Sequence, residues 1–121
     1  MYTYSFEKLE VWQLAHKFLI EIYLLTRTFP EHEKFGMTSQ LRRSALSISS
    51  NIAEGSSRKS MKDQCRFTEI AYGSLLESLN IIITAKDLDY INQEKYLELR
   101  EKIEILSNKL NAYHNSQKSR S

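Results

Sequence analysis

Residues 40–55 read Gln-Leu-Arg-Arg-Ser-Ala-Leu-Ser-Ile-Ser-Ser-Asn-Ile-Ala-Glu-Gly, a stretch in which apolar and polar residues alternate with a helical period. Together with Met37, its apolar residues fall three and four positions apart, which is the spacing of one helix face. The series is Met37, Leu41, Ala45 or Leu46, Ile48 and Ile52. The spacing predicts a helix over residues 33–54, and we expect Gly55 to end it as a left-handed cap.

The same spacing recurs on both sides of this stretch. Residues 6–28 carry two neighbouring apolar stripes, which are Leu9, Trp12, Ala15, Leu19 and Ile22, and Val11, Leu14, Phe18 and Leu25. In residues 61–88, the same spacing predicts an inward-facing set of Phe67, Ile70, Ala71, Leu75, Leu79, Ile82 or Ile83, and Ala85. In residues 93–113, the inward-facing set is Tyr96, Leu99, Ile103, Leu106 and Leu110. The pattern therefore predicts four helices, over about 6–28, 33–54, 61–88 and 93–113.

Local signals mark the ends of these helices. Pro30 stops the first one, because proline disfavours helical geometry in the residue before it. Ser60 with Asp63 resembles a capping box, and Asn92 is a favourable first cap for the last helix. Gly73 lies inside the third helix, where we interpret it as a mark of close helix contact.

The composition agrees with a single helical domain. The chain has 121 residues with only three Gly and one Pro, so backbone breakers are scarce. Four long helices with short connections predict an all-α, antiparallel up-down-up-down four-helix bundle over residues 1–114, followed by a polar, frayed tail at 115–121. The single Cys65 and the lack of a signal-peptide pattern predict a cytoplasmic protein that does not enter a membrane.

More apolar surface is present than one bundle core requires. The doubled stripe of the first helix and two clusters of the third, Leu75-Leu76 and Ile81-Ile82-Ile83, form this excess. We expect it to drive assembly into a homo-oligomer. A thick core within one copy is the alternative.

The sequence contains no recognisable catalytic, metal or cofactor site. His16, His32 and His114 lie on three different segments, and no Glu has a His three residues further on. The three glycines are too far apart to form a phosphate-binding loop. We therefore expect no enzyme, no cofactor and no small-molecule substrate.

Basic residues concentrate in the middle of the chain. Residues 34–66 hold seven basic and two acidic side chains. An exposed basic block is suited to nucleic-acid phosphates, and the candidate contacts are Arg42, Arg43, Arg58, Lys59, Lys62 and Arg66. The alternative is that this block pairs with the acidic segment 69–104, within one copy or between copies.

A polar stripe lies beside the apolar face of the second helix. Its members recur three and four apart and end next to a glycine: Gln40, Arg43, Ser47, Asn51, Glu54 and Gly55. One interpretation is a row of hydrogen-bond donors for a nucleic-acid backbone. The other is an ion-pair and amide network that fixes the register between subunits, which makes the protein a protein-interaction scaffold.

These residues also resemble a known family. The run 40–55, with Arg-Arg and Ser-Asn-Ile-Ala-Glu-Gly, strongly resembles the bacterial intervening-sequence proteins, which are encoded within insertions in 23S rRNA genes. Residues 9–15, 24–26, Phe29-Pro30 and 69–77 resemble the same family, so the likeness covers about residues 5–113. It implies a four-helix bundle that assembles into a homopentamer. The chain is also similar to the accessory variability determinant of diversity-generating retroelements, and that likeness implies association with RNA or DNA.

Overall fold

The computed structural model describes residues 1–120, and Ser121 lies outside the described residues. Four long helices follow one another: α1 (Glu10–Thr26), α2 (Met37–Ser56), α3 (Met61–Asp87) and α4 (Gln93–Ser119). Two short 3-10 turns, η1 (Ser5–Lys8) and η2 (Glu31–Glu33), precede α1 and α2. No strand occurs in residues 1–120, so the prediction of an all-α chain with four helices is confirmed.

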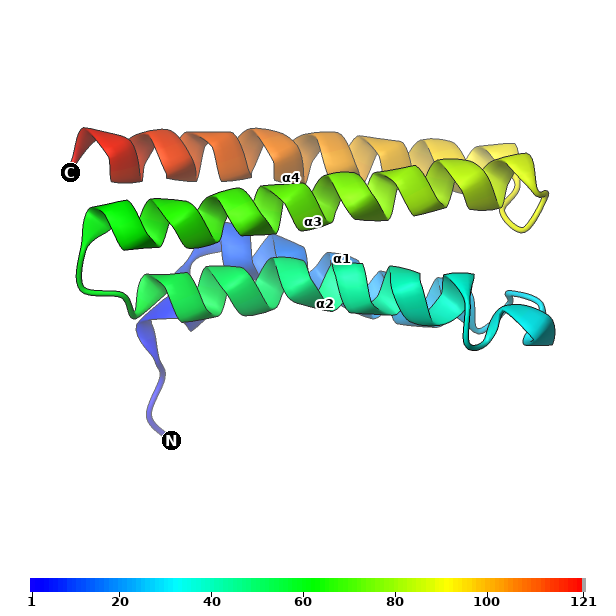
Figure 1. Cartoon of the computed structure of the whole chain (residues 1–121), viewed down its shortest axis with the longest axis horizontal. Helices are drawn as coiled ribbons and strands as arrows, with labels where there is room; N and C mark the ends of the chain where they lie inside the picture. The colour runs from blue at the N-terminus through cyan, green and yellow to red at the C-terminus, as the bar shows by residue number, and fades with distance from the viewer. Residues whose placement is uncertain (121) are drawn as a thin grey trace.

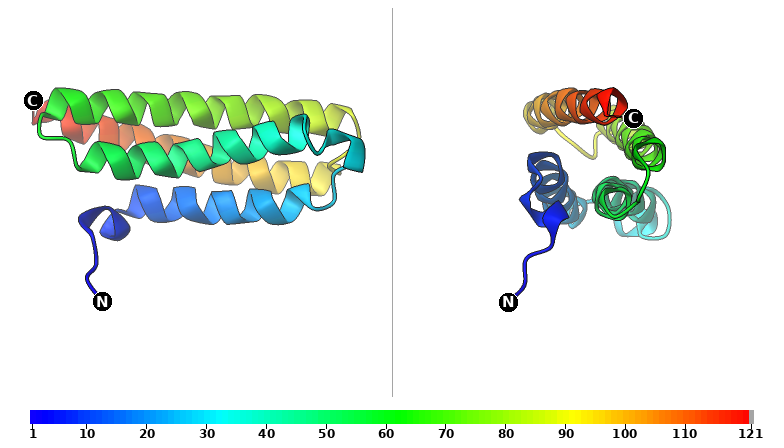
Figure 2. Two further views of the ribbon diagram at one scale, coloured as in Figure 1. Left: turned by 60° about the horizontal axis from the view of Figure 1, so that its bottom comes forward. Right: turned by 90° about the vertical axis from the view of Figure 1, so that its left-hand side faces the viewer.

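The helices lie along one common axis. Figure 1 shows the connection from α2 to α3 at one end of the molecule and the connection from α3 to α4 at the other end. The end view in Figure 2 places α1 and α2 on one side and α3 and α4 on the opposite side. Each helix contacts its two neighbours around this arrangement, and α4 closes it against α1. The apolar core therefore lies between the four helices.

The two predicted helix starts at residues 6 and 33 are 3-10 turns instead. Leu9 is extended, with φ −73° and ψ 125°, and it separates η1 from α1. Before α2, Glu33 Oε1 accepts a hydrogen bond from the Met37 backbone N–H at 3.1 Å, and Glu33 Oε2 accepts one from the Tyr90 hydroxyl at 3.0 Å. These hydrogen bonds lower the pKa of Glu33. The Glu33 carboxylate, which lies in η2 before α2, thus caps the positive end of α2.

The two predicted caps of the later helices are confirmed. Ser60 Oγ accepts a hydrogen bond from the backbone N–H of Asp63 at 3.1 Å at the start of α3. Asn92 Oδ1 accepts one from the backbone N–H of Lys95 at 2.8 Å at the start of α4. Each satisfies one of the four N–H groups that a helix start leaves unpaired.

The interpretations of Gly55 and Gly73 are both wrong. Gly55 lies inside α2, no glycine has a positive φ, and the helix continues to Ser56. A Cβ atom at Gly55 would lie 2.6 Å from Cβ of Phe67, so this glycine permits close approach of α2 and α3. A Cβ atom at Gly73 would meet nothing within 4 Å, so no close helix contact exists there.

The last helix is longer than the sequence predicts. It continues to Ser119 rather than ending near Tyr113, so residues 115–119 are helical and the predicted frayed tail is wrong over them. The reason is Gln117, which is 1% exposed and accepts a hydrogen bond at Oε1 from the Thr68 hydroxyl at 2.7 Å. A buried contact with α3 therefore orders a segment whose composition is polar.

The core confirms most of the inward-facing residues but not all. Ala45 and Ile82 are fully buried, whereas their neighbours Leu46 and Ile83 are exposed. Ile70 is 42% exposed and does not lie in the core, which corrects its assignment. In α1, the second stripe lies against the core rather than in solvent, with Val11 and Phe18 buried and with Leu14 and Leu25 partly buried. The thick-core alternative is therefore right for this stripe.

Ion pairs connect α1 to α4. The Glu21 carboxylate contacts Nζ of Lys95 at 3.0 Å and Nζ of Lys102 at 2.7 Å. Burial alone raises the pKa of Glu21, but the hydrogen bonds and charges of these two lysines outweigh it and lower the pKa overall. Glu10 contacts Nζ of Lys109 at 2.9 Å from an exposed position. The acidic residues of α1 are thus directed toward α4.

Candidate nucleic-acid interface

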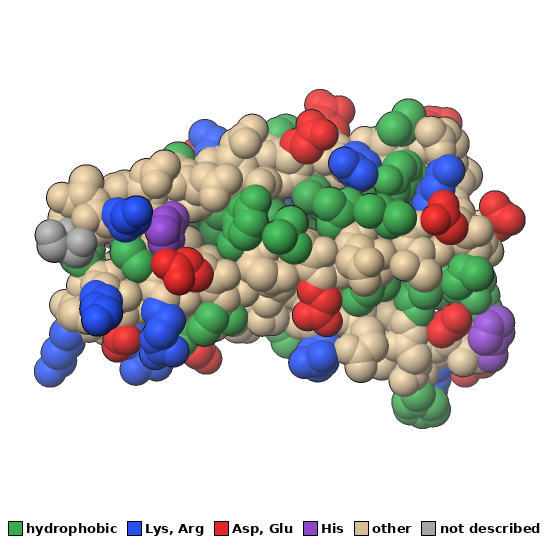
Figure 3. All heavy atoms as spheres, turned by 45° about the horizontal axis from the view of Figure 1, so that its top comes forward, with side chains coloured by type: hydrophobic (Ala, Val, Ile, Leu, Met, Phe, Trp, Pro, Cys, Tyr) green, Lys and Arg blue, Asp and Glu red, His purple; other side chains and the backbone are tan. Residues whose placement is uncertain are grey.

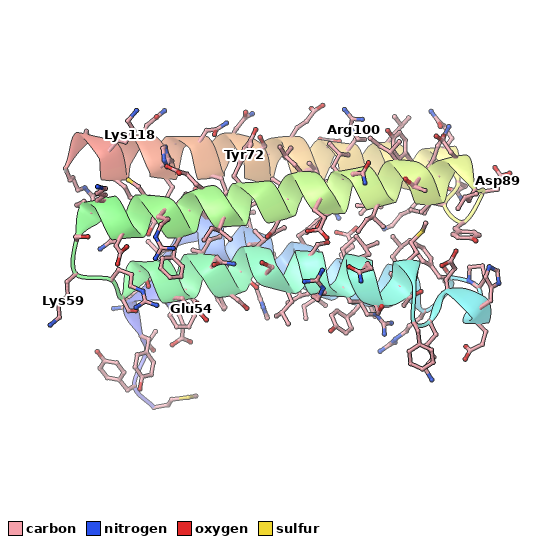
Figure 4. The ribbon with its side chains drawn as sticks, viewed as in Figure 1. Glu54, Lys59, Tyr72, Asp89, Arg100 and Lys118 are labelled. Atoms are coloured by element: carbon pink, nitrogen blue, oxygen red, sulfur yellow. The ribbon has the colours of Figure 1, made fainter. Side chains whose placement is uncertain are left out.

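The connection from α2 to α3 carries the densest basic cluster of the described chain. Residues 58–66 hold four basic side chains and one carboxylate, that of Asp63. Arg58, Lys59, Lys62 and Arg66 are all exposed. Figure 4 shows Lys59 at the tip of this connection, pointing away from the bundle. The geometry of the connection is fixed by the Ser60 cap and by Gln64, whose Nε2 donates a hydrogen bond to the Arg58 carbonyl oxygen at 2.8 Å.

Two guanidinium groups of this cluster lie against one aromatic ring. The guanidinium carbon of Arg58 is 4.6 Å from the centroid of the Phe67 ring, and that of Arg66 is 4.9 Å from the same centroid. Phe67 is buried, and its Cβ lies against Gly55 of α2. Cations stacked on a ring gain cation-π attraction, and the ring holds their stems in place. Phe67 therefore positions both arginines at the surface.

Little negative charge offsets these arginines. Arg66 approaches Asp63 Oδ1 at 3.4 Å, a long contact between two exposed side chains. The next carboxylate along α3, Glu69, lines the same surface pocket as Lys62 and Arg66, and it also contacts His114 Nε2 at 2.7 Å. The cluster thus retains a surplus of positive charge.

The end of α4 adds basic residues that we did not name as site residues. Figure 4 places Lys118 at the same end of the bundle as Lys59, and Arg120 caps the C-terminal end of α4. Arg120 Nη2 donates a hydrogen bond to Ser116 Oγ at 2.9 Å. The basic composition of residues 105–121 was the signal for these two residues. We call the six side chains Arg58, Lys59, Lys62, Arg66, Lys118 and Arg120 the basic end.

Arg42 and Arg43 do not join the basic end, because both lie further back along α2. Arg42 Nε donates a hydrogen bond to Thr26 Oγ1 at 2.8 Å, and its guanidinium carbon is 4.7 Å from the centroid of the Tyr23 ring. Arg43 Nη2 donates a hydrogen bond to Gln40 Oε1 at 3.0 Å and lies 3.9 Å from Glu77 Oε2. Arg42 thus connects α1 to α2. Among residues 1–120, the ion pair of Arg43 with Glu77 alone connects the basic segment 34–66 with the acidic segment 69–104.

The polar stripe of α2 contacts α3 within the same copy. Ser47 Oγ hydrogen-bonds Ser74 Oγ at 2.8 Å, and Asn51 Nδ2 donates to the Ser47 carbonyl oxygen at 2.8 Å. Next to this pair, the buried Ser44 Oγ and Ser78 Oγ form the same kind of hydroxyl–hydroxyl hydrogen bond between α2 and α3 at 2.8 Å. These small polar residues and Gly55 form a closely packed α2–α3 contact. Glu54 is exposed at the outer edge of this stripe.

The described part of the chain offers no other obvious site. Residues 1–120 bring together no group of three or more His, Cys, Asp or Glu side chains that could hold a metal ion. Cys65 is buried and is not part of a disulfide. The three histidines are far apart in the fold and contact Trp12, Tyr90 and Glu69. Within residues 1–120, every helix is too short or too polar to cross a membrane.

Comparison with known proteins places the chain in a family. A solved structure from Bacteroides thetaiotaomicron, a protein of unknown function from the S23 ribosomal protein family, matches with a TM-score of 0.77 and 23% sequence identity. The match covers 86% of this chain and 97% of that one, and it shows a shared fold. None of the curated proteins matches the chain. The model of the 23S rRNA-intervening sequence protein family matches residues 7–112, and the chain belongs to this family.

Proposed function

We propose that the chain is a cytoplasmic, non-enzymatic protein that binds nucleic-acid phosphates through its basic end. In this proposal, antiparallel up-down-up-down bundles assemble into a homo-oligomer, and five copies is the number that the family resemblance implies. The observation that carries the proposal is the placement of Arg58 and Arg66 against the one Phe67 ring, where Asp63 forms an ion pair with Arg66 alone.

The two arginines are suited to a phosphate for a physical reason. Two guanidinium groups at 4.6 Å and 4.9 Å from one ring centroid concentrate positive charge in one place, and this charge attracts an anion. Guanidinium binds phosphate oxygens through two parallel hydrogen bonds, and a positioned side chain loses less conformational entropy on binding. Lys59 and Lys62 are exposed beside them and provide further charge for neighbouring phosphates.

RNA is the nucleic acid to test first. The family description refers to 23S rRNA, which supports RNA as the ligand without identifying a sequence. The basic end consists of exposed arginines and lysines on one connection and two helix ends. Such side chains are suited to phosphate contacts, so we expect contacts to the backbone rather than base readout. We therefore expect binding that depends strongly on salt and weakly on sequence.

A second candidate is a protein-interaction scaffold. It is favoured by the α2 stripe, where the exposed carboxylate of Glu54 has no ion-pair partner among residues 1–120. In this function, the stripe serves subunit assembly and the ligand is another protein. Replacing Arg43 and Asn51 by Ala distinguishes the two: loss of the oligomer favours the scaffold, whereas an intact oligomer that still binds RNA favours the basic end.

The direct test compares RNA binding by matched charge variants. Fluorescence anisotropy of a labelled single-stranded RNA oligonucleotide is measured at low salt with the wild type and with Arg58→Gln/Arg66→Gln. We expect the double variant to bind about tenfold more weakly or worse. The control is Lys34→Gln/Lys86→Gln, which removes the same charge at the opposite end of the bundle. Equal weakening by both variants would show that net charge, not the basic end, determines binding.

A further inference from the structure

Exposed apolar residues gather on a face over α1 and α2. On α1, Ile20 is 48% exposed and Leu24 is 52% exposed, and they lie one helical turn apart with Tyr23 between them. On α2, Leu46 is 46% exposed and lies one turn beyond Arg42. Because Arg42 stacks on Tyr23, it joins the two helices into one surface.

This surface is basic. Arg42 and Arg27 lie on it, and Arg27 is exposed and without an ion pair in residues 1–120. The two carboxylates of α1 are elsewhere, since Glu10 pairs with Lys109 and Glu21 pairs with Lys95 and Lys102. The carboxylate of α2, Glu54, lies about two turns beyond Leu46. We call Ile20, Tyr23, Leu24, Arg27, Arg42 and Leu46 the α1/α2 face.

A second apolar surface lies over α3 and α4. A groove between these helices is lined by Leu76, Leu79 and Ile103, among others. Leu76 is 48% exposed, Ile83 follows it two turns later, and Leu97 of α4 is 55% exposed. Figure 3 shows hydrophobic side chains along the middle of this face, with both acidic and basic side chains around them.

This second surface is acidic. Asp87 follows Ile83 by one turn, and Glu101 and Glu104 follow Leu97 by one and two turns. All three carboxylates are exposed, and none takes part in an ion pair among the described residues. Two cations lie between these helices beside the three carboxylates: Arg100 donates a hydrogen bond to the Tyr96 hydroxyl at 3.0 Å, and Nζ of Lys86 is 5.7 Å from the Tyr96 ring centroid. We call Leu76, Ile83, Asp87, Leu97, Glu101 and Glu104 the α3/α4 face.

The two faces lie on opposite sides of the bundle, as the end view of Figure 2 shows. We propose that the α1/α2 face of one copy docks on the α3/α4 face of the next copy, so that the contact is heterologous. Each copy then uses both faces, one for each neighbour. Such a contact closes into a ring when the rotation between copies permits it. This inference rests on the proposed homo-oligomer and specifies which surfaces build it.

Opposite charges favour contact between an α1/α2 face and an α3/α4 face over contact between two like faces. Two α1/α2 faces would bring Arg27 and Arg42 against their own copies, and two α3/α4 faces would bring Glu101 and Glu104 together. Like charges across an interface cost several kcal/mol and suppress the wrong partner, whereas opposite charges fix the register. Both faces have half-exposed leucines, which bury apolar area in the contact. The pairing of unlike faces therefore gains both the attraction of opposite charges and the burial of apolar area.

The test uses two variants that each disable one face. The first is Leu24→Asp/Leu46→Asp, and the second is Leu76→Asp/Leu97→Asp. All four leucines are about half exposed, so the fold tolerates the changes, and circular dichroism checks this. The masses of the wild type, each variant and their equimolar mixture are measured by native mass spectrometry.

We expect the wild type to be an oligomer, each variant alone to be a monomer, and the mixture to form a dimer of one copy of each. The dimer arises because the intact α3/α4 face of the first variant meets the intact α1/α2 face of the second. The control Ile70→Asp/Phe35→Asp changes two exposed apolar residues outside both faces and should retain the wild-type mass.

Other outcomes overturn the proposal. If either variant keeps the wild-type mass, or if the mixture remains monomeric, the heterologous contact is wrong while the homo-oligomer stands. If the wild type itself is a monomer, both the homo-oligomer and the heterologous contact are wrong. A charge-only pair, Arg27→Glu and Glu101→Lys, gives a second test should an aspartate variant misfold. Each of these should weaken assembly alone, and the double variant Arg27→Glu/Glu101→Lys should restore it, because every contact then joins opposite charges again.

Discussion

A Cβ atom at Gly55 would lie 2.6 Å from Cβ of Phe67, a separation that real Cβ atoms do not show. This contact sets how closely α2 approaches α3 near the basic end. It also places the Phe67 ring, on which Arg58 and Arg66 lie. The glycine that ends the Ser-Asn-Ile-Ala-Glu-Gly run is therefore a packing residue, and it connects the family-like sequence to the candidate interface.

Gly55→Ala should destabilise the protein. Alanine favours helix, but the added methyl group forces α2 and α3 apart, and overpacking of this kind costs about 1–3 kcal/mol. Chemical denaturation measures the free energy of unfolding. The matched control is Gly73→Ala, also inside a helix but with open space around it, which should stabilise by about 0.5–1 kcal/mol. Equal effects at the two glycines would contradict the close contact.

Gln117→Ala should destabilise the fold by about 1–3 kcal/mol, because it leaves a cavity and removes the acceptor of the Thr68 hydroxyl. The same unfolding measurement checks it. An exposed glutamine at the start of α4 is the control, and Gln93→Ala should change the stability by less than about 0.5 kcal/mol. If Gln117→Ala is as harmless as the control, the end of α4 does not dock against α3.

Glu21→Gln should reduce both the stability and its dependence on pH. The folded pKa of Glu21 is below its ordinary value, so the ionised carboxylate stabilises the fold above that ordinary value. This contribution is lost as the pH falls through the folded pKa. The variant should lose about 1 kcal/mol at neutral pH and progressively less as the pH falls through the folded pKa of Glu21.

Glu10→Gln is the control for Glu21. Glu10 also pairs with a lysine of α4, but its side chain is 68% exposed, so the pair is screened by solvent. Urea unfolding at neutral pH and in acid compares the stability of both variants with that of the wild type. If Glu21→Gln lowers the free energy of unfolding as much in acid as at neutral pH, packing rather than charge explains the effect of this substitution.

Local features of the fold followed from the sequence. The caps at Ser60 and Asn92 depend on a side chain and a backbone N–H three residues later, and short-range rules describe such contacts well. The apolar spacing also identified the four helices. Adjacent apolar residues remained ambiguous, because spacing alone did not decide between Ile82, which is buried, and Ile83, which is exposed.

What the sequence missed depends on contacts between distant segments. Gly55 reads as a cap until Phe67, on the next helix, is seen against it. Arg42 and Arg58 look equally suited to phosphate, but the first is bound to Thr26 of α1 and the second lies on an exposed connection. Gln117 is polar by composition and buried by its contact with α3. None of these contacts is encoded in local propensity.

The salt dependence of RNA binding measures how many phosphates the basic end contacts. The logarithm of the association constant is plotted against the logarithm of the salt concentration for the wild type and for Arg58→Gln/Arg66→Gln. Each phosphate contact contributes about 0.7–0.9 to the slope, so losing both arginines should reduce its magnitude by about 1.4–1.8. Equal slopes for the two proteins, or no binding by the wild type at low salt, would contradict phosphate recognition at the basic end.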